Sequence, residues 1–505
     1  MDPVERHALP PDVSFDGGDL DCGNGLLLLI RSHIDPLDRG RLLEIRSTEI
    51  SVDEDLPAWC RMTGNDLVSW TKHGKQRSFL VCKGTLAERK PSAAPPRAGP
   101  PDLRPVSVTI PASLPSPAPS PSIAPLSVAG IGSWPRPRWM IRAIHDRLEG
   151  RLSEQDFQST ADDAVRLSVD AQLRAGVDVV TDGEQRRDNY SSFVGALLDN
   201  CRLIPLTDLL PLVDDPAKLE EEMRSLDVPA SDVRHPAVFG PLGRSRPLAV
   251  HELAFARSLT SKPVKVALPG PYLLTRTMWM ECFSGRAYAA REALADDVVR
   301  ILREELHFLL AAGAAIVQFD EPVLTEVVFT GVKHTRSFMC GALSEKGDSA
   351  AELAFARELI NRVVAGQPRE RVALHVCRGN WTRDERSALA GDYRPLLATF
   401  QALNVGTYFL ELCTPRAGEM EVLRDLPSDR RVGVGVVNQK HDRVESVDEI
   451  VEHGRRAIRV FGPDRILLNP DCGFATFADN PVSSAATAER KLESIVHAAE
   501  ILRRG

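Results

Sequence analysis

The sequence has few of the features that mark secreted, membrane-spanning or nucleic-acid-binding proteins. Its 9 cysteines among 505 residues are odd in number and widely spaced, which excludes the disulfide framework of a small secreted domain. No apolar run approaches the roughly 20 residues of a membrane span, and a formal net charge of −8 offers nucleic acid no electrostatic attraction. The first residues also lack the basic and apolar regions of a signal peptide. We therefore expect a cytoplasmic protein with reduced thiols, and neither a membrane nor nucleic acid as partner.

The composition indicates a globular protein with more than one domain. Hydrophobic residues make up 43% and charged residues 26% of the chain, as in ordinary globular proteins, and 505 residues exceed the usual size of one domain. Between residues 86 and 125 the chain is rich in proline and favours an extended linker. We therefore predict a small domain at 1–85, a linker at 86–125 and a large domain at 126–505.

The predicted small domain shows the patterns of a two-layer α+β fold. They indicate a helix at 26–30, a strand at 42–48, a helix at 53–64, and a hairpin formed by 67–71 and 77–82. Cys22 lies at the start of the first helix, where the positive end of the helix dipole favours a thiolate. Cys60 lies inside the second helix beside a tryptophan, so we expect burial to make it inert.

These residues resemble the TusA-type sulfur-carrier family in the segment around Cys22, in residues 55–64 and in the closing hairpin. In that family the matching cysteine carries a persulfide, which implies sulfur carriage by Cys22 and a cysteine desulfurase as partner. The family's Cys-Pro-X-Pro loop is replaced here by Cys22-Gly23-Asn24-Gly25. The alternative is therefore a degenerate carrier that serves in docking or regulation.

Strand-like and helix-like segments alternate throughout the predicted large domain. The candidate strands are 128–133, 178–184, 264–270, 315–322, 372–377, 407–411, 432–437 and 465–472. Eight such units in about 380 residues predict an α/β fold of the TIM (β/α)8 barrel type, with a doubly wound sheet as the alternative. The longest insertion falls between residues 189 and 263.

Metal-ligand side chains follow several of these strands. His375 and Cys377 are two apart, so a strand directs both to the same face. Glu411 and Cys472 end later strands, and the carboxyl ends of barrel strands form the active site. Imidazole and thiolate ligands suit Zn²⁺. Cys413 is a rival ligand to Glu411, and we expect it to pack instead.

The large domain resembles the catalytic domain of cobalamin-independent methionine synthase. The matching stretches are 131–133, 182–184 with Arg187, 269–271, 318–322, 375–377, Glu411 and 469–473. The resemblance implies that His375, Cys377, Glu411 and Cys472 bind Zn²⁺. It also implies that Ser133, Glu184, Arg187 and Asp320 hold the amino acid part of homocysteine while its thiol receives a methyl group.

The sequence departs from the folate-using members of that family in two places. Those proteins carry a histidine after the seventh strand as a general acid, whereas here Lys440 falls at the matching place and His441 follows it. Both are candidate proton donors. Their additional N-terminal barrel is replaced by the small domain, so the resemblance leaves the alkyl donor open.

Three functions follow from these patterns. The first is zinc-dependent transfer of a methyl or other alkyl group to a thiol such as homocysteine. The second is C–S bond chemistry in which persulfide sulfur on Cys22 is delivered to the barrel. The third is a zinc protein without catalysis, which the full set of ligand residues argues against.

Overall fold

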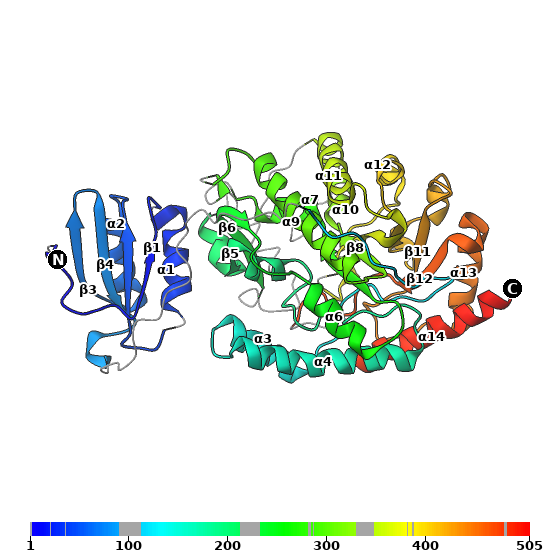
Figure 1. Ribbon diagram of the computed structural model, residues 1–505, viewed down its shortest axis with the longest axis horizontal. Helices are drawn as coiled ribbons and strands as arrows, with labels where there is room; N and C mark the ends of the chain where they lie inside the picture. The colour runs from blue at the N-terminus through cyan, green and yellow to red at the C-terminus, as the bar shows by residue number, and fades with distance from the viewer. Residues whose placement is uncertain are drawn as a thin grey trace.

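The computed structural model describes residues 3–20, 22–35, 37–89, 113–212, 233–280, 284–285, 287–329, 348–380, 382–385, 388–478 and 482–505. They form an N-terminal unit at residues 3–89 and a large unit that begins at residue 113, which lie end to end in Figure 1. Most of the predicted linker, residues 90–112, lies outside the described residues. None of the helices in the described part of the chain is long and apolar enough to cross a membrane.

The N-terminal unit is a four-stranded sheet with two helices. Its elements are β1 (Val13–Asp16), α1 (Leu27–Ile34), β2 (Leu42–Ser47), α2 (Val52–Thr63), β3 (Asp66–His73) and β4 (Gln76–Cys82). The strand order is β1-β2-β4-β3, with β1 parallel to β2 and the other pairs antiparallel. Helices and strands occupy the segments in which the sequence predicts them, apart from β1. That strand escaped prediction because its four residues are too few to show a period.

The large unit is built on a six-stranded parallel sheet. The strands are β7 (Lys265–Pro269), β8 (Ile316–Asp320), β9 (Val372–Val376), β10 (Thr407–Leu410), β11 (Arg431–Val437) and β12 (Ile466–Pro470), in the spatial order β12-β11-β10-β9-β8-β7. Every neighbouring pair is parallel. The strands are buried along their length, as expected for continuous apolar runs covered by helices.

Isolated parallel bridges continue this pairing beyond the six strands. Val128 pairs with Leu468 of β12, Ala129 pairs with Val179, and Val180 pairs with Val264 next to β7. The two predicted first strands, 128–133 and 178–184, thus contribute short paired segments between the two edges of the sheet. Parallel pairing passes through eight segments in total.

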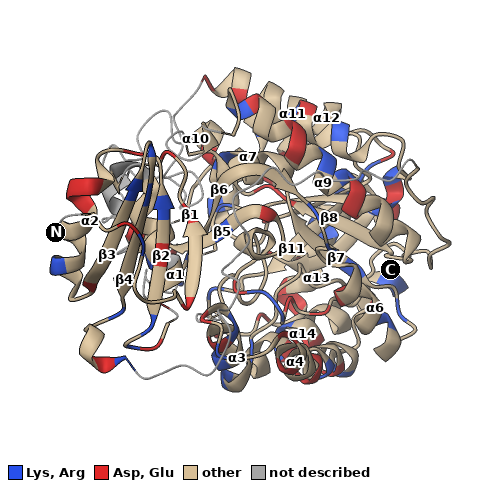
Figure 2. Ribbon diagram, turned by 60° about the vertical axis from the view of Figure 1, so that its left-hand side comes forward, with Lys and Arg blue, Asp and Glu red and all other residues tan. Residues whose placement is uncertain are grey.

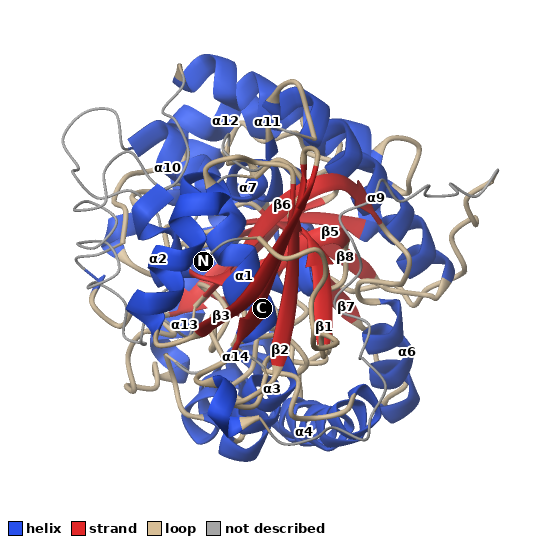
Figure 3. Cartoon of the chain, turned by 90° about the vertical axis from the view of Figure 1, so that its left-hand side faces the viewer, coloured by secondary structure: helices blue, strands red, loops and turns tan. Residues whose placement is uncertain are grey.

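Helices surround these strands, as Figure 3 shows from the side of the N-terminal unit. They are α3 (Arg138–Leu148), α4 (Glu154–Ala175), α6 (Val250–Leu259), α7 (Pro271–Met278), α9 (Arg291–Ala311), α10 (Val323–Phe329), α11 (Ser349–Val364), α12 (Leu397–Ala402), α13 (Val447–Phe461) and α14 (Ala485–Arg504). Local chemistry sets their limits. The side chain of Ser153 caps α4 by accepting a bond from the backbone N–H of Asp156, and Gly176 ends it with φ of 85°.

The insertion after the second strand segment carries an antiparallel hairpin. It consists of β5 (Asp199–Pro205) and β6 (Arg234–Gly243), with a 3-10 segment at Leu206–Leu212 after β5. The N-terminal unit docks on this insertion, and the views in Figures 1 and 3 agree on that placement. Because the insertion leaves the carboxyl end of a strand segment, the N-terminal unit lies at that end of the parallel sheet.

Two kinds of polar contact join the N-terminal unit to the insertion. The guanidinium of Arg31 lies 2.5 Å from the carboxylate of Asp208, and Nη1 of Arg202 lies 3.4 Å from Nε2 of His33. The interface therefore contains polar as well as apolar residues. Figure 2 shows basic and acidic residues interspersed over both units.

The residues just before the large unit's first strand segment run along the amino ends of the strands. Arg371, at the start of the β9 segment, donates to the carbonyl of Ala118, and Arg431 of β11 donates to the carbonyls of Ile123 and Ala124. The side chain of Ile123 packs against an apolar cluster inside the sheet that includes Phe409. The interior is thus closed at this end, opposite the N-terminal unit.

Candidate active site

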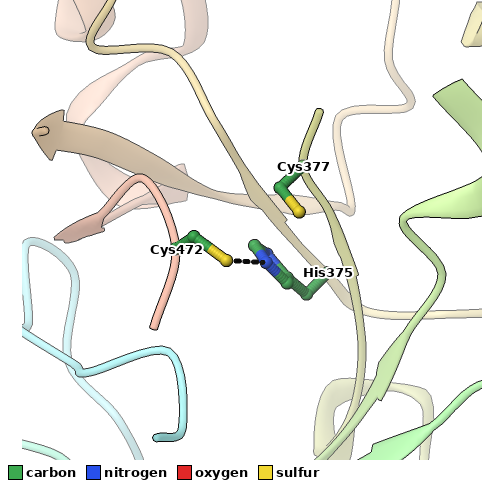
Figure 4. Close-up of side chains that lie close together, drawn as sticks. All are labelled: His375, Cys377 and Cys472. Carbon is green, nitrogen blue, oxygen red and sulfur yellow. Dashed lines mark hydrogen bonds between the residues drawn. The ribbon is translucent and has the colours of Figure 1, made fainter. Parts of the chain in front are cut away.

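A cluster of one imidazole and two thiols lies at the carboxyl end of the parallel strands. His375 is on β9, Cys377 follows that strand directly, and Cys472 follows β12. Their ligand atoms all lie within 4.8 Å of one another, and the three side chains converge in Figure 4. They come from strands that are not neighbours in the sheet. They come together because the parallel pairing continues from β12 through the segments at 128–129 and 179–180 back to β7, which closes the sheet on itself.

Hydrogen bonds orient the imidazole toward the thiols. Nδ1 of His375 lies 3.0 Å from the carbonyl oxygen of Phe409, which can only accept, so Nδ1 carries the proton. Nε2 is then free of hydrogen and lies 3.5 Å from Sγ of Cys472. A histidine whose outer nitrogen is fixed by a carbonyl is the usual arrangement for a metal ligand.

The electrostatics of the cluster favour a thiolate. A hydrogen bond from the thiol of Cys472, together with the neighbouring His375, holds the pKa of Cys377 well below its usual range despite its burial. The carboxylate of Asp471 fixes the loop that carries Cys472, because Oδ1 accepts bonds from the backbone N–H groups of Leu412 and Cys413. The cluster is therefore preorganised for a soft cation.

Glu411 lies beside this cluster but is bound elsewhere. Its Oε1 is 2.6 Å from Nη2 of Arg416, and its Oε2 accepts a 2.9 Å bond from the backbone N–H of Arg378. The group of ligand atoms within 4.8 Å among the described residues comprises His375, Cys377 and Cys472. Cys413 also lies outside that group, and burial raises the pKa of its thiol.

A cavity with about 50 Å³ of free space opens next to the cluster. Three residues predicted to bind substrate line it, namely Ser133, Glu184 and Asp320, together with the three cluster residues. Its other lining residues are Ile131, Tyr190, Pro322, Asn380, Gly473, Thr476 and Phe477. Apolar lining residues with a few convergent polar groups are typical of a small-molecule site.

Two buried carboxylates face this cavity. Burial raises the pKa of Glu184 to about 7, against the opposing effect of Arg187, and its Oε2 has no hydrogen-bond partner among the described residues. Burial likewise raises the pKa of Asp320, whose Oδ1 accepts a 2.7 Å bond from Nε2 of Gln318. Buried carboxylates attract a cation, because a positive partner would relieve their desolvation.

Arg187 lies behind the cavity and does not line it. It donates to Glu252 at 2.6 Å and to the carbonyl of Ala267 at 2.9 Å, and its Nη1 lies 3.9 Å from Oε1 of Glu184. Its guanidinium is fully engaged by the protein. The position of Arg187 supports Glu184 and offers no contact with a ligand in the cavity.

The two predicted proton donors also lie outside the cavity lining. Lys440 is buried and its Nζ donates to the carbonyl of Thr382 at 2.6 Å, while burial lowers its pKa. The ring of His441 is exposed, and its Nε2 lies 2.7 Å from the carboxylate of Glu385. Lys440 therefore points away from solvent and His441 toward it.

The two cysteines of the N-terminal unit are both buried. Cys22 begins a π-helical turn, Cys22–Leu26, that leads into α1 and packs against the Leu206–Leu212 segment of the insertion. The start of a helix is where the sequence places it, but the thiol of Cys22 is buried, whereas a sulfur carrier needs an exposed thiol. Cys60 is buried in α2, and burial raises its pKa to about 12, as its predicted inertness requires.

Four of the cavity residues were not predicted as site residues because they lie in loops. Tyr190, Thr476 and Phe477 follow no strand end directly, and nothing local in the sequence marks them. Asn380 carried a weak signal, since it lies three residues after Cys377. Its Nδ2 donates to the carbonyl of Gly473 and to Oγ1 of Thr476, and so ties the β9 loop to the β12 loop.

Comparison with known proteins gives a consistent result for the large unit. The methionine synthase of Saccharolobus solfataricus is 26% identical over 374 residues, which cover 74% of this chain and 93% of that protein. The methionine synthase of Pyrococcus abyssi is 28% identical over 383 residues, covering 76% and 94%. Both alignments span nearly the whole of the relative.

Solved structures show the same fold. A B12-independent methionine synthase from Shewanella sp. W3-18-1 superimposes with a TM-score of 0.56 at 24% identity, covering 75% of this chain and 98% of that one. A putative vitamin-B12-independent methionine synthase from Listeria monocytogenes gives 0.54 at 18% identity, covering 76% and 99%. The α/β fold with its parallel sheet is thus confirmed.

The family described as "Cobalamin-independent synthase, Catalytic domain" matches residues 126–500. This match confirms the predicted family and enzyme class of the large unit, while the alternative of sulfur delivery from Cys22 is not favoured. The match does not extend to the N-terminal unit. The chain belongs to the family of the cobalamin-independent synthase catalytic domain.

Proposed function

We propose that this chain is a zinc-dependent methyltransferase that methylates the thiol of homocysteine to give methionine. The observation that carries the proposal is the meeting of two sites in one cavity. A His-Cys-Cys cluster lies at one side, and the two buried carboxylates Glu184 and Asp320 lie among the other lining residues. A compound with a thiol at one end and an ammonium group at the other matches both.

The cluster fits a zinc ion in its dimensions and its chemistry. A tetrahedral ion with bonds of about 2.3 Å to sulfur and about 2.0 Å to nitrogen separates these two ligands by about 3.5 Å. Sγ of Cys472 and Nε2 of His375 lie 3.5 Å apart. When bound, Zn²⁺ lowers the pKa of a coordinated thiol, so that the nucleophilic thiolate is available at neutral pH.

Glu411 is the proposed fourth protein ligand, although its carboxylate is bonded to Arg416 and Arg378 in this structure. Its carboxylate lies at the end of β10, beside the strand that carries His375, and Arg416 retains it by an ion pair. A carboxylate exchanges more readily than a thiolate at a borderline-soft ion. Glu411 is therefore suited to leave the fourth position to the substrate thiol.

The chain's own polar residues would orient the amino acid part of the substrate. Glu184 and Asp320 would accept the ammonium group, and Ser133 also lines the cavity. Arg187 holds Glu184 from behind. Lys440 is our first candidate for proton donation because it is buried near Glu411 and the thiols, whose charges act on its pKa. His441 is the second candidate, at the exposed side of the Glu385 ion pair.

The domain arrangement is part of the proposal. We assign residues 1–85 to a TusA-like domain, 86–125 to a linker and 126–505 to a TIM (β/α)8 barrel. The continuous parallel pairing through eight segments supports the barrel. The two-layer N-terminal sheet with its helices supports the first domain. Because Cys22 is buried and its turn contacts the insertion, a docking role suits that domain better than sulfur carriage.

Growth rescue of a methionine auxotroph tests the function. The chain should restore growth without methionine, and Cys377→Ser should abolish the rescue because a soft ligand is lost. Cys413→Ser is the matched control, since Cys413 lies one strand away and outside the cluster. Cys22→Ser should rescue as well as the unchanged chain. Failure of the unchanged, zinc-loaded protein to form methionine from homocysteine in active lysate would reject the proposal.

A further inference from the structure

A lysine lies in the interior of the sheet, below the cavity, with no part in the proposed reaction. Lys265 is on β7 and is 1% exposed. Its Nζ donates a 2.6 Å bond to Oε1 of Gln318 and lies 4.0 Å from the centre of the Phe409 ring. A buried ammonium group is costly unless it is paired. A lysine kept in this place therefore calls for a role.

The contacts of Lys265 lead to the substrate cavity in two hydrogen bonds. Gln318 accepts from Lys265 with its carbonyl oxygen and donates with Nε2 to Oδ1 of Asp320 at 2.7 Å. Gln318 and Asp320 are two apart on β8, so their side chains share the interior face. Asp320 then lines the cavity beside His375.

The direction of this chain of bonds depends on the lysine. An amide side chain has an accepting end and a donating end, whereas a lysine can only donate. Lys265 therefore holds the oxygen of Gln318 toward itself and the NH₂ group toward Asp320. Without the lysine, the amide is free to rotate and present its oxygen to the carboxylate, which would repel it.

Charge acts in the same sense as the hydrogen bonds. Burial lowers the pKa of Lys265 to about 7, and the carboxylates of Asp320 and Glu184 oppose that shift. These two carboxylates favour the ammonium form, which can only donate and so holds the oxygen of Gln318 toward Lys265.

We propose that Lys265 is a positioning residue for recognition of the substrate's amino group: through Gln318 it fixes the carboxylate of Asp320 in the orientation that accepts the ammonium. This inference rests on the proposed function. It assigns to Lys265 a selectivity for thiols that carry an amino group over those that lack it.

The test compares two thiols on the zinc-loaded full chain. Homocysteine carries the amino group, and 4-mercaptobutanoate is the same molecule without it. Calorimetry gives the affinity of each, and metal analysis checks that zinc content is unchanged. Lys265→Met should weaken homocysteine binding by roughly ten- to hundredfold, the effect of a hydrogen bond to a charged group, and leave 4-mercaptobutanoate unaffected.

A double-mutant cycle separates positioning from packing. Gln318→Met should cause the same loss of preference, and the Lys265→Met/Gln318→Met double variant should be no worse than either single one, because both interrupt one relay. Lys72→Met, in the N-terminal unit, is the control for loss of a lysine and should keep the full preference. If Lys265→Met does not fold, Gln318→Met alone decides the question, by the ratio of its affinities for homocysteine and 4-mercaptobutanoate.

The two possible failures are distinct. A preference for homocysteine that survives in Lys265→Met, or equal weakening of both thiols, rejects the role of Lys265 and leaves the proposed function intact. An unchanged protein that binds both thiols equally rejects the carboxylate clamp itself, and the proposed recognition of homocysteine with it.

Discussion

The substitution Glu184→Gln should stabilise the ligand-free protein at alkaline pH and lower its affinity for homocysteine. Glu184 is 3% exposed, and one of its oxygens has no hydrogen-bond partner among the described residues. Burial raises its pKa from 4.5 to about 7. When Glu184 is ionised, its negative charge is only partly compensated by the protein, so a bound cation would stabilise it. A glutamine has nearly the same shape and carries no charge.

The sign of the effect follows from linkage. The pKa of Glu184 is higher in the folded than in the unfolded state, so ionisation lowers the free energy of unfolding. The unchanged protein keeps the full stability below pH 4.5 and loses it as the pH rises through about 7. Each pKa unit corresponds to about 1.36 kcal/mol. The stability of Glu184→Gln minus that of the unchanged protein should therefore rise by about 2.5 kcal/mol between pH 5 and pH 8.

Urea denaturation at both pH values measures this difference. The unchanged protein and Glu184→Gln are compared without ligand, so that every other titrating group cancels to first order. Homocysteine added at pH 8 should stabilise the unchanged protein more than the variant, since its ammonium pairs with the carboxylate. A pH-independent difference between the two proteins would refute the reasoning, because it would mean that Glu184 is not held protonated by burial.

Three further outcomes are expected. Cys377→Ser and Cys472→Ser should each lose bound zinc and activity together, measured by metal analysis and methionine formation, because a hydroxyl is a poor replacement for a soft thiolate; full metal retention in both would contradict the cluster as a metal site. Asp320→Asn should weaken homocysteine binding by about 1.5–3 kcal/mol with zinc retained, by calorimetry; loss of the metal would show that Asp320 belongs to the metal site. Arg31→Glu should loosen the N-terminal unit, since its ion pair with Asp208 becomes a repulsion; faster proteolysis of the linker detects this, and an unchanged rate would mean that the interface holds without this ion pair.

The sequence pattern was sufficient to identify the six strands of the parallel sheet and the direction of their side chains. His375 and Cys377 point to one face because a strand has a period of two residues. The carboxyl ends of parallel strands meet at one end of the sheet, so Cys472 from a later strand was expected nearby. The family resemblance indicated Ser133, Glu184 and Asp320, all of which line the cavity.

The partners of charged side chains were decided only by the tertiary structure. Arg187 was expected at the substrate and instead pairs with Glu252, which lies 65 residues away in the chain. Glu411 was expected at the metal and is bonded to Arg416 and to the backbone of Arg378. The position of a strand end fixes the backbone from which such a side chain extends. The side chain itself is long and flexible, so its partner depends on which groups the folded chain brings near.

The burial of Cys22 is the clearest case of a property that local sequence does not contain. Its place before a helix was evident from the apolar run that follows it. The turn that it begins packs against the Leu206–Leu212 segment, which belongs to an insertion nearly two hundred residues later. Sequence alone thus determined the strands of the parallel sheet and which face their side chains present. The contact between the two units depends on the long-range meeting of surfaces, and for that the tertiary structure was required.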